Sequence, residues 1–141
     1  MKKLFLSIAI ILTVFSTAFA KYPDVVNSRV AASFVKDFHN VSNVRWSSTR
    51  NYIVAIFEMD SQTKFAYYDY QGNLAAVVQH MLTSSLPEDL HADIKKNYSN
   101  YWVSELFQVT NEQGIHYYIQ LKNADQTLVL TTQGTGSWHA Y

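Results

Sequence analysis

The stretch KFAYYDYQGNL, residues 64–74, decides how this chain folds. It places four aromatic side chains within six positions: Phe65, Tyr67, Tyr68 and Tyr70. The run then breaks at Gln71-Gly72-Asn73. Because aromatic residues favour strands, and Gly and Asn favour turns, the stretch predicts a strand followed by a tight turn. Neighbours in a strand point to opposite faces, so Tyr67 and Tyr68 must lie on different faces of one sheet.

Seven further segments have the same strand-like character, and short polar turns separate most of them. They are NVRWSS (43–48), YIVAIFEMD (52–60), NLAAVVQHM (73–81), WVSELFQVT (102–110), IHYYIQLK (115–122), TLVLTTQ (127–133) and GSWHAY (136–141). Connections this short join strands as antiparallel hairpins.

Two segments have helical spacing instead, with apolar residues every four positions. The first runs from Tyr22 to about Asn40, with Asp24 as its expected N-cap. The second follows Pro87, which is tolerated in the first turn of a helix. The apolar stripes are Val26, Val30, Phe34 and Phe38 in the first helix, and Leu86, Leu90, Ile94 and Tyr98 in the second.

The two helix-plus-strands segments, 21–82 and 83–141, resemble each other. The offset is 60 residues from Phe34 to Ile94, and 62 residues from Gly72 to Gly134. The sequence therefore predicts an α+β fold in which two αβ repeats share one curved antiparallel sheet. Each repeat contributes one helix and a meander of up to four strands, and both helices cover the same face.

The order of these motifs resembles the PepSY-like, β-lactamase-inhibitor-like family of exported bacterial proteins. The matching features are a helix, VSNVRW with its Trp46, an aromatic strand ending in FEMD, YYDYQGNL, and LP at the start of a second helix. The second repeat departs from the pattern, since Leu130-Thr131 stands in place of Tyr-Asp. The resemblance implies a secreted or periplasmic α+β domain with an inhibitory or binding role, and it supplies no catalytic residues.

Residues 1–20 have the pattern of a signal peptide: two lysines, an apolar run from Leu4 to Val14, and Ala18-Phe19-Ala20 as a cleavage signal. Cleavage before Lys21 leaves residues 21–141 as one domain. The chain has 11 basic and 11 acidic residues. Removing Lys2 and Lys3 leaves 9 basic residues against 11 acidic ones, a formal charge of −2. No basic stripe suits nucleic acid, and no segment after the cleavage point suits stable membrane insertion.

The sequence contains no recognisable catalytic motif, so it does not predict an enzyme. There is no cysteine, no nucleophile elbow, no phosphate-binding loop and no local cluster of metal ligands. We therefore expect no catalytic residues, no metal and no cofactor. The alternative is a small-ligand carrier or small enzyme of cone-like form, whose enclosed pocket would use Asp69 or His116. A third reading is self-association through the edge segment GSWHAY.

The alternation of the strands predicts a second, aromatic face turned away from the helices. Tyr68 aligns with Leu130 and should face the helices, which leaves Tyr67 on the open side. Tyrosine offers a large contact area and a polar tip, so this face is a candidate surface for another exported protein or a peptide. Its predicted binding residues are Tyr52, Phe65, Tyr67, His116 and Tyr118. The other interpretation is that these aromatic residues only stiffen the sheet through cross-strand contacts.

Overall fold

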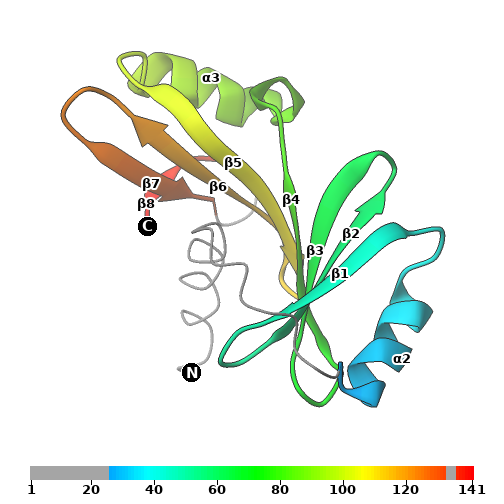
Figure 1. The fold of residues 1–141 in the computed structure, drawn as a ribbon. Coiled ribbons are helices and arrows are strands. Elements are labelled where there is room, and N and C mark those ends of the chain that lie inside the picture. The colour runs from blue at the N-terminus through cyan, green and yellow to red at the C-terminus, as the bar shows by residue number, and fades with distance from the viewer. Residues whose placement is uncertain (1–25, 133–135) are drawn as a thin grey trace.

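The computed structural model describes residues 26–132 and 136–141. Eight strands form one open antiparallel sheet, in which every strand pairs with its neighbours in the sequence (Figure 1). The strands are β1 (Ser42–Ser48), β2 (Ile53–Met59), β3 (Gln62–Tyr68), β4 (Leu74–His80), β5 (Trp102–Asn111), β6 (Gly114–Lys122), β7 (Thr127–Thr131) and β8 (His139–Ala140). This confirms the predicted α+β class and the antiparallel sheet.

Within the described residues, two α-helices accompany the sheet: α2 (Ser28–Asp37) precedes β1, and α3 (Glu88–Asn97) lies between β4 and β5. A 3₁₀ turn, η1 (Thr83–Ser85), leads into α3. The N-cap of α2 is Asn27, whose side chain accepts from the Arg29 N–H. The structure therefore begins α2 later than the sequence predicted, because Asn27 supplies the capping oxygen. The predicted cap Asp24 and the signal peptide, residues 1–20, lie outside the described residues.

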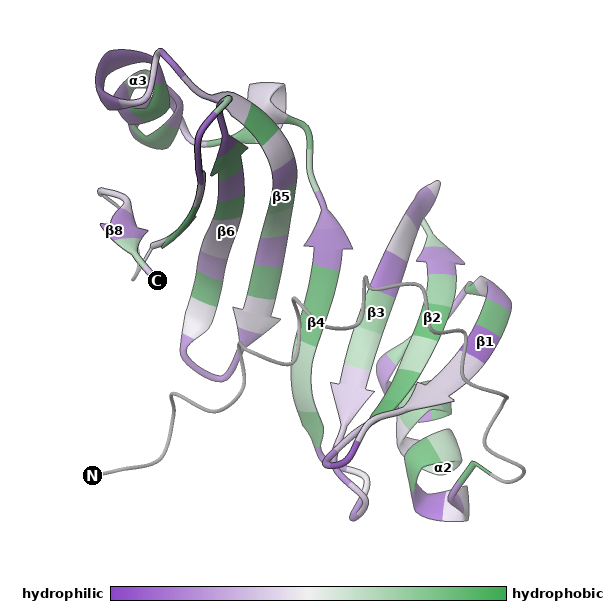
Figure 2. Ribbon diagram, turned by 60° about the vertical axis from the view of Figure 1, so that its left-hand side comes forward, coloured by the Kyte–Doolittle hydropathy of each residue, from purple (hydrophilic) through white to green (hydrophobic). Residues whose placement is uncertain are grey.

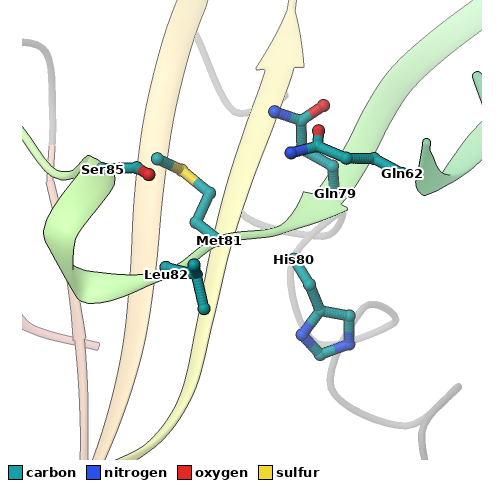
Figure 3. Close-up of a pocket in the computed structure, with 6 residues that line it drawn as sticks. All are labelled: Gln62, Gln79, His80, Met81, Leu82 and Ser85. Carbon is teal, nitrogen blue, oxygen red and sulfur yellow. The ribbon is translucent and has the colours of Figure 1, made fainter. Parts of the chain in front are cut away.

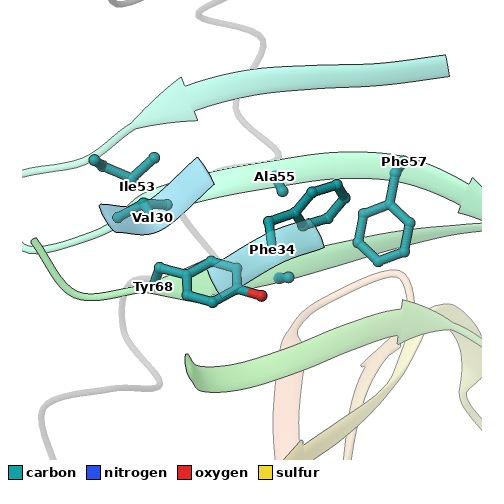
Figure 4. Close-up of a cluster of buried hydrophobic side chains, with 7 residues drawn as sticks. Val30, Phe34, Ile53, Ala55, Phe57 and Tyr68 are labelled. Carbon is teal, nitrogen blue, oxygen red and sulfur yellow. The ribbon is translucent and has the colours of Figure 1, made fainter. Parts of the chain in front are cut away.

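The first core cluster lies between α2 and strands β2 and β3. Val30 and Phe34 of α2 pack against Ala55, Phe57 and Tyr68, all of them buried. Figure 4 shows these side chains gathered from the three elements. The Phe34 ring meets Phe57 edge-on at 5.1 Å and Trp46 at 5.2 Å, both between centroids. Tyr68 therefore faces the helix, as the alternation of the sequence predicted.

The second core cluster lies between α3 and strands β5 to β7. Leu90 packs with Leu106, Ile119 and Leu130. Trp138, just before β8, donates from its ring nitrogen Nε1 to the Leu90 carbonyl at 3.0 Å. Leu106 pairs with Ile119 and Ile119 with Leu130, so these side chains share one face of the sheet. Following the pairing across β4 shows that this is also the face that α2 covers.

The turn after β3 fixes α2 to the sheet. Asn27 donates to the Tyr70 carbonyl at 2.8 Å, so the helix cap also holds the turn. Gly72 has a φ of +91°, and a Cβ there would come within 3.2 Å of the Arg29 carbonyl and 3.1 Å of the Ser33 hydroxyl. The residues of the YDYQGN segment thus have a structural role, since they join the hairpin to the first turns of the helix.

Both edges of the sheet are irregular. In β1 the pairing with β2 shifts between Ser42 and Arg45, and Asn43 there has a φ of 52°. At the other edge, β8 contributes only two residues, which pair with Leu130 and Thr131. The predicted edge segment 136–141 is therefore much shorter as a strand than its sequence suggested.

The two halves of the sheet do not share one hairpin register. Tyr68 pairs with Ile53, whereas its predicted counterpart Leu130 pairs with Ile119. Tyr68 and Leu130 are 62 residues apart, but their partners are 66 apart (119 − 53). The loop between β6 and β7, residues 123–126, is also longer than the loop between β2 and β3, residues 60–61. The two-repeat architecture stays a prediction.

Candidate binding face

The face of the sheet opposite the helices carries a continuous apolar floor, which we call the helix-free face. Its centre is a cluster of six buried residues that come from five successive strands: Val54, Tyr67, Val78, Phe107, Val109 and Tyr118. In Figure 2, hydrophobic positions run along these strands on both sides of β4, the strand that joins the two halves of the sheet. The sheet thus has a second apolar surface in addition to its helix-covered core.

The strand register explains why these residues meet. Val54 pairs with Tyr67, Val78 with Val109, and Phe107 with Tyr118, so each pair lies on one face. Around the centre pack partly buried side chains: Tyr52, Ile56, Phe65, Ala75 and Ala76. The Tyr52 and Tyr67 rings meet edge-on, with their centroids 6.1 Å apart. The structure therefore places Tyr52, Phe65, Tyr67 and Tyr118 of the predicted site on this face.

The degree of burial corrects one expectation. The sequence predicted an uncovered aromatic surface, but Tyr67 is only 3% exposed and Tyr118 only 5%. Burial raises the pKa of Tyr67 to about 12, because the phenolate is poorly solvated there. Burial is also the main cause that raises the pKa of Tyr118. The central tyrosines therefore form a floor rather than a set of projecting side chains.

Two buried polar atoms on this face have no hydrogen-bond partner among the residues that the structure describes: the Tyr67 hydroxyl and His116 Nε2. His116 pairs with Val109 of the floor, which puts it on the same face. Its other ring nitrogen, Nδ1, lies 3.2 Å from the Thr132 carbonyl oxygen. A carbonyl only accepts, so Nδ1 donates, and in the neutral ring Nε2 is left as an acceptor. Buried polar atoms are normally paired, so the two atoms require an explanation.

Two exposed aromatic residues extend the same face and were not among the predicted site residues. Trp102 opens β5 and pairs with Lys122, which alternates with the helix-facing Leu121, so Trp102 faces away from the helices. It is 57% exposed. The ring of Tyr141 lies 6.3 Å from that of Tyr118 and is 52% exposed. Alternation from the helix-facing Leu106 would place Trp102 on the helix side, and the register shift between Val103 and Glu105 reverses it. No local pattern in the sequence indicated the position of Trp102.

The side chain of Asp69, a candidate residue of the ligand-pocket alternative, is hydrogen-bonded within the turn after β3. Its carboxylate accepts from the backbone N–H groups of Gln71 and Asn73, both at 2.9 Å, and from the Asn73 side chain at 2.8 Å. Partial burial acts to raise the pKa of Asp69, but these hydrogen bonds outweigh it and hold the pKa below its usual value. An acceptor that closes a turn in this way stabilises the loop between β3 and β4.

A pocket of about 380 Å³ lies near the end of β4. Its lining residues are Gln62, Gln79, His80, Met81, Leu82 and Ser85, drawn in Figure 3. The two glutamine amides lie together, while the His80 ring points away from them. Neither Asp69 nor His116 lines this pocket. The ligand-carrier alternative required an enclosed cavity at Asp69 or His116, and the pocket near β4 is not that cavity.

Two further features bear on the class of site. Within residues 26–132 and 136–141, no three His, Asp or Glu side chains come together in a way that could hold a metal ion. Over the same part of the chain, neither helix is long and apolar enough to cross a membrane.

No protein-family model matches the chain, and no curated protein matches it significantly. Solved structures from Bacteroides do resemble it. A BLIP-like protein from Bacteroides fragilis is 16% identical, with a TM-score of 0.74 over 86% of this chain and 88% of its own. A DUF2874 family protein from Bacteroides uniformis is 18% identical, with a TM-score of 0.74 over 81% and 86%.

A third structure, from Bacteroides eggerthii, belongs to a protein provisionally assigned to the periplasm. It is 15% identical, with a TM-score of 0.71 over 84% of this chain and 86% of its own. Identities this low show that the fold is shared. The chain therefore has the fold of a BLIP-like protein, in agreement with the β-lactamase-inhibitor-like part of the predicted resemblance. The PepSY-like part stays a prediction.

Proposed function

We propose that this chain is an exported, non-enzymatic binding protein that holds another exported protein on its helix-free face. Export is supported by the signal-peptide pattern of residues 1–20 and by the structural neighbour provisionally assigned to the periplasm. The BLIP-like neighbour makes inhibition of the bound protein the first consequence to test.

The observation that carries this proposal is the pair of exposed aromatic rings on the same face of the sheet as a buried aromatic floor. Trp102 and Tyr141 are each more than half exposed, and Tyr141 packs on Tyr118 of the floor. Binding energy at protein interfaces is concentrated in aromatic anchors, above all Trp and Tyr. An apolar face that also carries exposed aromatic side chains is typical of a surface that a partner covers.

A capture experiment tests the proposal. The mature chain, residues 21–141, is immobilised and exposed to periplasmic extract of the source cell, and the retained proteins are compared between variants. We expect Trp102→Ala to weaken capture of a specific protein by tenfold or more, the loss of about 1.4 kcal/mol that an aromatic anchor readily exceeds. Leu82→Ala is the matched control, because Leu82 is 73% exposed and lines the pocket near β4 instead.

The two variants separate the binding face from the pocket. Loss of capture with Trp102→Ala alone supports the helix-free face. Loss with Leu82→Ala alone would assign the function to the pocket lined by Gln62 and Gln79, and the proposal would be wrong. Adding the captured protein's own activity assay to the experiment then tests inhibition directly.

A further inference from the structure

We propose that the pocket at the end of β4 binds a small, uncharged, hydroxyl-rich molecule of the sugar class. The side chains of Gln62, Gln79 and Ser85 hold this ligand by hydrogen bonds. The site lies on the helix side of the sheet, away from the helix-free face, so it is independent of the proposed function.

The pocket lies where neither helix covers the sheet. Gln79 alternates with Val78 of the helix-free face, so its side chain points to the helix side. Figure 2 shows α2 and α3 on opposite sides of β4. Val77, the next helix-side residue of β4, belongs to neither helix cluster in the described part of the chain. The second half of β4 is therefore left open between the two cores.

Two side-chain amides supply hydrogen-bonding groups on this open strip. Gln62 comes from the start of β3 and Gln79 from β4, and their amides lie together (Figure 3). Within the described residues, neither amide is hydrogen-bonded to another protein group. Gln62 is exposed and Gln79 half-buried, so a ligand can reach both. Each amide can accept from one hydroxyl and donate to the next, because it carries an acceptor oxygen and two N–H donors.

The remaining lining combines a hydroxyl with apolar carbon. Ser85 supplies the hydroxyl from η1, and its N–H donates to the Leu82 carbonyl at 2.9 Å. Met81 is bound to the neighbouring strand, since its N–H donates to the Leu106 carbonyl at 3.0 Å. The backbone thus holds these residues in place before a ligand arrives. The side chains of Met81 and Leu82 offer apolar contact to the C–H groups of a sugar ring.

The lining selects an uncharged ligand. Of the six lining residues only His80 can carry a charge, and its ring points away from the amides (Figure 3). That ring packs on Phe107 of the helix-free face, with 4.3 Å between the centroids. A charged ligand would lose hydration in the pocket without gaining an opposite charge.

The size and the polar groups of the pocket favour a sugar over a protein segment. Its volume of about 380 Å³ lies within the range of about 300–1,000 Å³ that is common for small-molecule sites. Hydroxyl groups both donate and accept, as do the two amides taken whole and the Ser85 hydroxyl. A ring with neighbouring hydroxyls can therefore satisfy all three side chains at once.

Titration with sugars tests this inference. The probes are glucose, galactose, mannose and xylose, and the readout is the ¹H–¹⁵N signals of the glutamine side-chain amides in residues 21–141. We expect at least one of these sugars to shift the Gln62 and Gln79 amide signals in a saturable way at millimolar concentration. Glucosamine and glucuronate, the charged counterparts of glucose, should bind at least threefold more weakly than the best neutral sugar.

An amide without hydroxyl groups is the chemical control. N-acetylalanine amide offers donors and acceptors of the peptide type, and we expect it to bind at least threefold more weakly than the best sugar. Equal or tighter binding would show that the pocket takes amides, and the assignment to hydroxyl-rich ligands would be wrong.

Three glutamine variants address the lining. Gln62→Met and Gln79→Met remove an amide and keep the length of the side chain, so each should weaken the best sugar about fivefold, the effect of one hydrogen bond. Gln108→Met is the matched control, because Gln108 pairs with Gln79 on the same face but does not line the pocket. It should leave the affinity unchanged, and the backbone signals of all three variants should show an intact fold.

The outcomes separate this site from the helix-free face. The inference is wrong if no probe sugar shifts the two amide signals, if charged sugars bind equally well, or if Gln62→Met and Gln79→Met bind like the wild type. Trp102→Ala should leave sugar binding unchanged, since Trp102 lies on the opposite face. Loss of sugar binding in Trp102→Ala would move the ligand to that face and overturn the pocket assignment.

Discussion

The Tyr68 hydroxyl donates to the Asp37 carboxylate at 2.9 Å and so links the end of β3 to the last turn of α2. Tyr68 is fully buried, whereas Asp37 lies at the surface. Burial, together with the hydrogen bond and the negative charge of Asp37, raises the pKa of Tyr68 well above its ordinary value. One side chain therefore contributes an apolar ring to the core and a polar bond to the helix end.

Truncation of Tyr68 separates these two contributions. Tyr68→Phe should lower the free energy of unfolding by about 1 kcal/mol, because Asp37 is exposed and regains water in exchange for the lost bond. Tyr68→Ala should lower it by about 3–5 kcal/mol, because the core also loses the ring. Urea denaturation of both variants measures the difference. Equal losses for the two would mean that the hydroxyl, and not the ring, holds this position.

The turn after β3 predicts a matched pair of glycine substitutions. Gly72→Ala should lower the free energy of unfolding by about 2 kcal/mol or more. The left-handed backbone at this position contributes about 1–2 kcal/mol of that loss, and the close approach of the new side chain to α2 adds to it. Gly114→Ala is the control, since its φ is +109° but no atom lies within 4 Å of the added carbon. Thermal denaturation should find Gly72→Ala the more damaging of the two. A larger effect at Gly114 would contradict the tight contact between turn and helix.

Asp69 predicts a stability change at acidic pH. Its pKa in the folded chain is below the ordinary 3.8, so its stabilising effect is complete above that value. As the pH falls below 3.8, the unfolded chain binds the proton first, and the stabilisation is lost progressively. Denaturation midpoints measured between about pH 5 and pH 2.5 should decline less steeply for Asp69→Asn than for the wild type. Parallel declines would show that the turn does not depend on the ionised carboxylate.

The helix stripes predict unequal effects at positions that the sequence treats as equivalent. Phe34 is 5% exposed and contacts several rings, whereas Ile94 is only partly buried at the margin of the α3 cluster. Phe34→Ala should therefore cost about 3–5 kcal/mol and Ile94→Ala about 1–2 kcal/mol. Denaturant titrations of both variants, with exposed Val35→Ala as the control, measure the difference. Similar losses of unfolding free energy at Phe34 and Ile94 would mean that the two positions are equivalent, as the sequence repeat suggests, despite the lower burial of Ile94.

Much of the fold could be predicted because local patterns and tertiary structure agree. The alternation through Tyr67 and Tyr68 identified the two faces of β3, and Leu86, Leu90, Ile94 and Tyr98 all belong to the α3 cluster. The predicted start of α2 was wrong because two possible capping residues, Asp24 and Asn27, are close in sequence. The bond from the Asn27 side chain to the Tyr70 carbonyl favours Asn27, and this tertiary contact is not visible in the local sequence. The register of β6 with β7 differs from that of β2 with β3, and periodicity does not determine which residues of two strands pair.

The candidate site was only partly predictable. The face of the sheet on which a side chain lies follows from the alternation of side chains along a strand, so Tyr52, Phe65 and Tyr67 could be placed on one surface. Burial depends on how neighbouring strands bring their side chains together, and Phe107 and Val109 fill the floor next to Tyr118. The bond that orients His116 involves Thr132, 16 residues away, and no local pattern indicates it.

The irregular edges of the sheet have a consequence for how separate copies of the chain behave in solution. An open sheet exposes unpaired backbone groups at both sides, and such edges can recruit strands of other molecules into aggregates. Here the bulge and the left-handed Asn43 interrupt the template at β1, and β8 offers only two residues at the other side. The chain, which has no cysteine for disulfide cross-links, thereby limits the growth of its sheet through its edges.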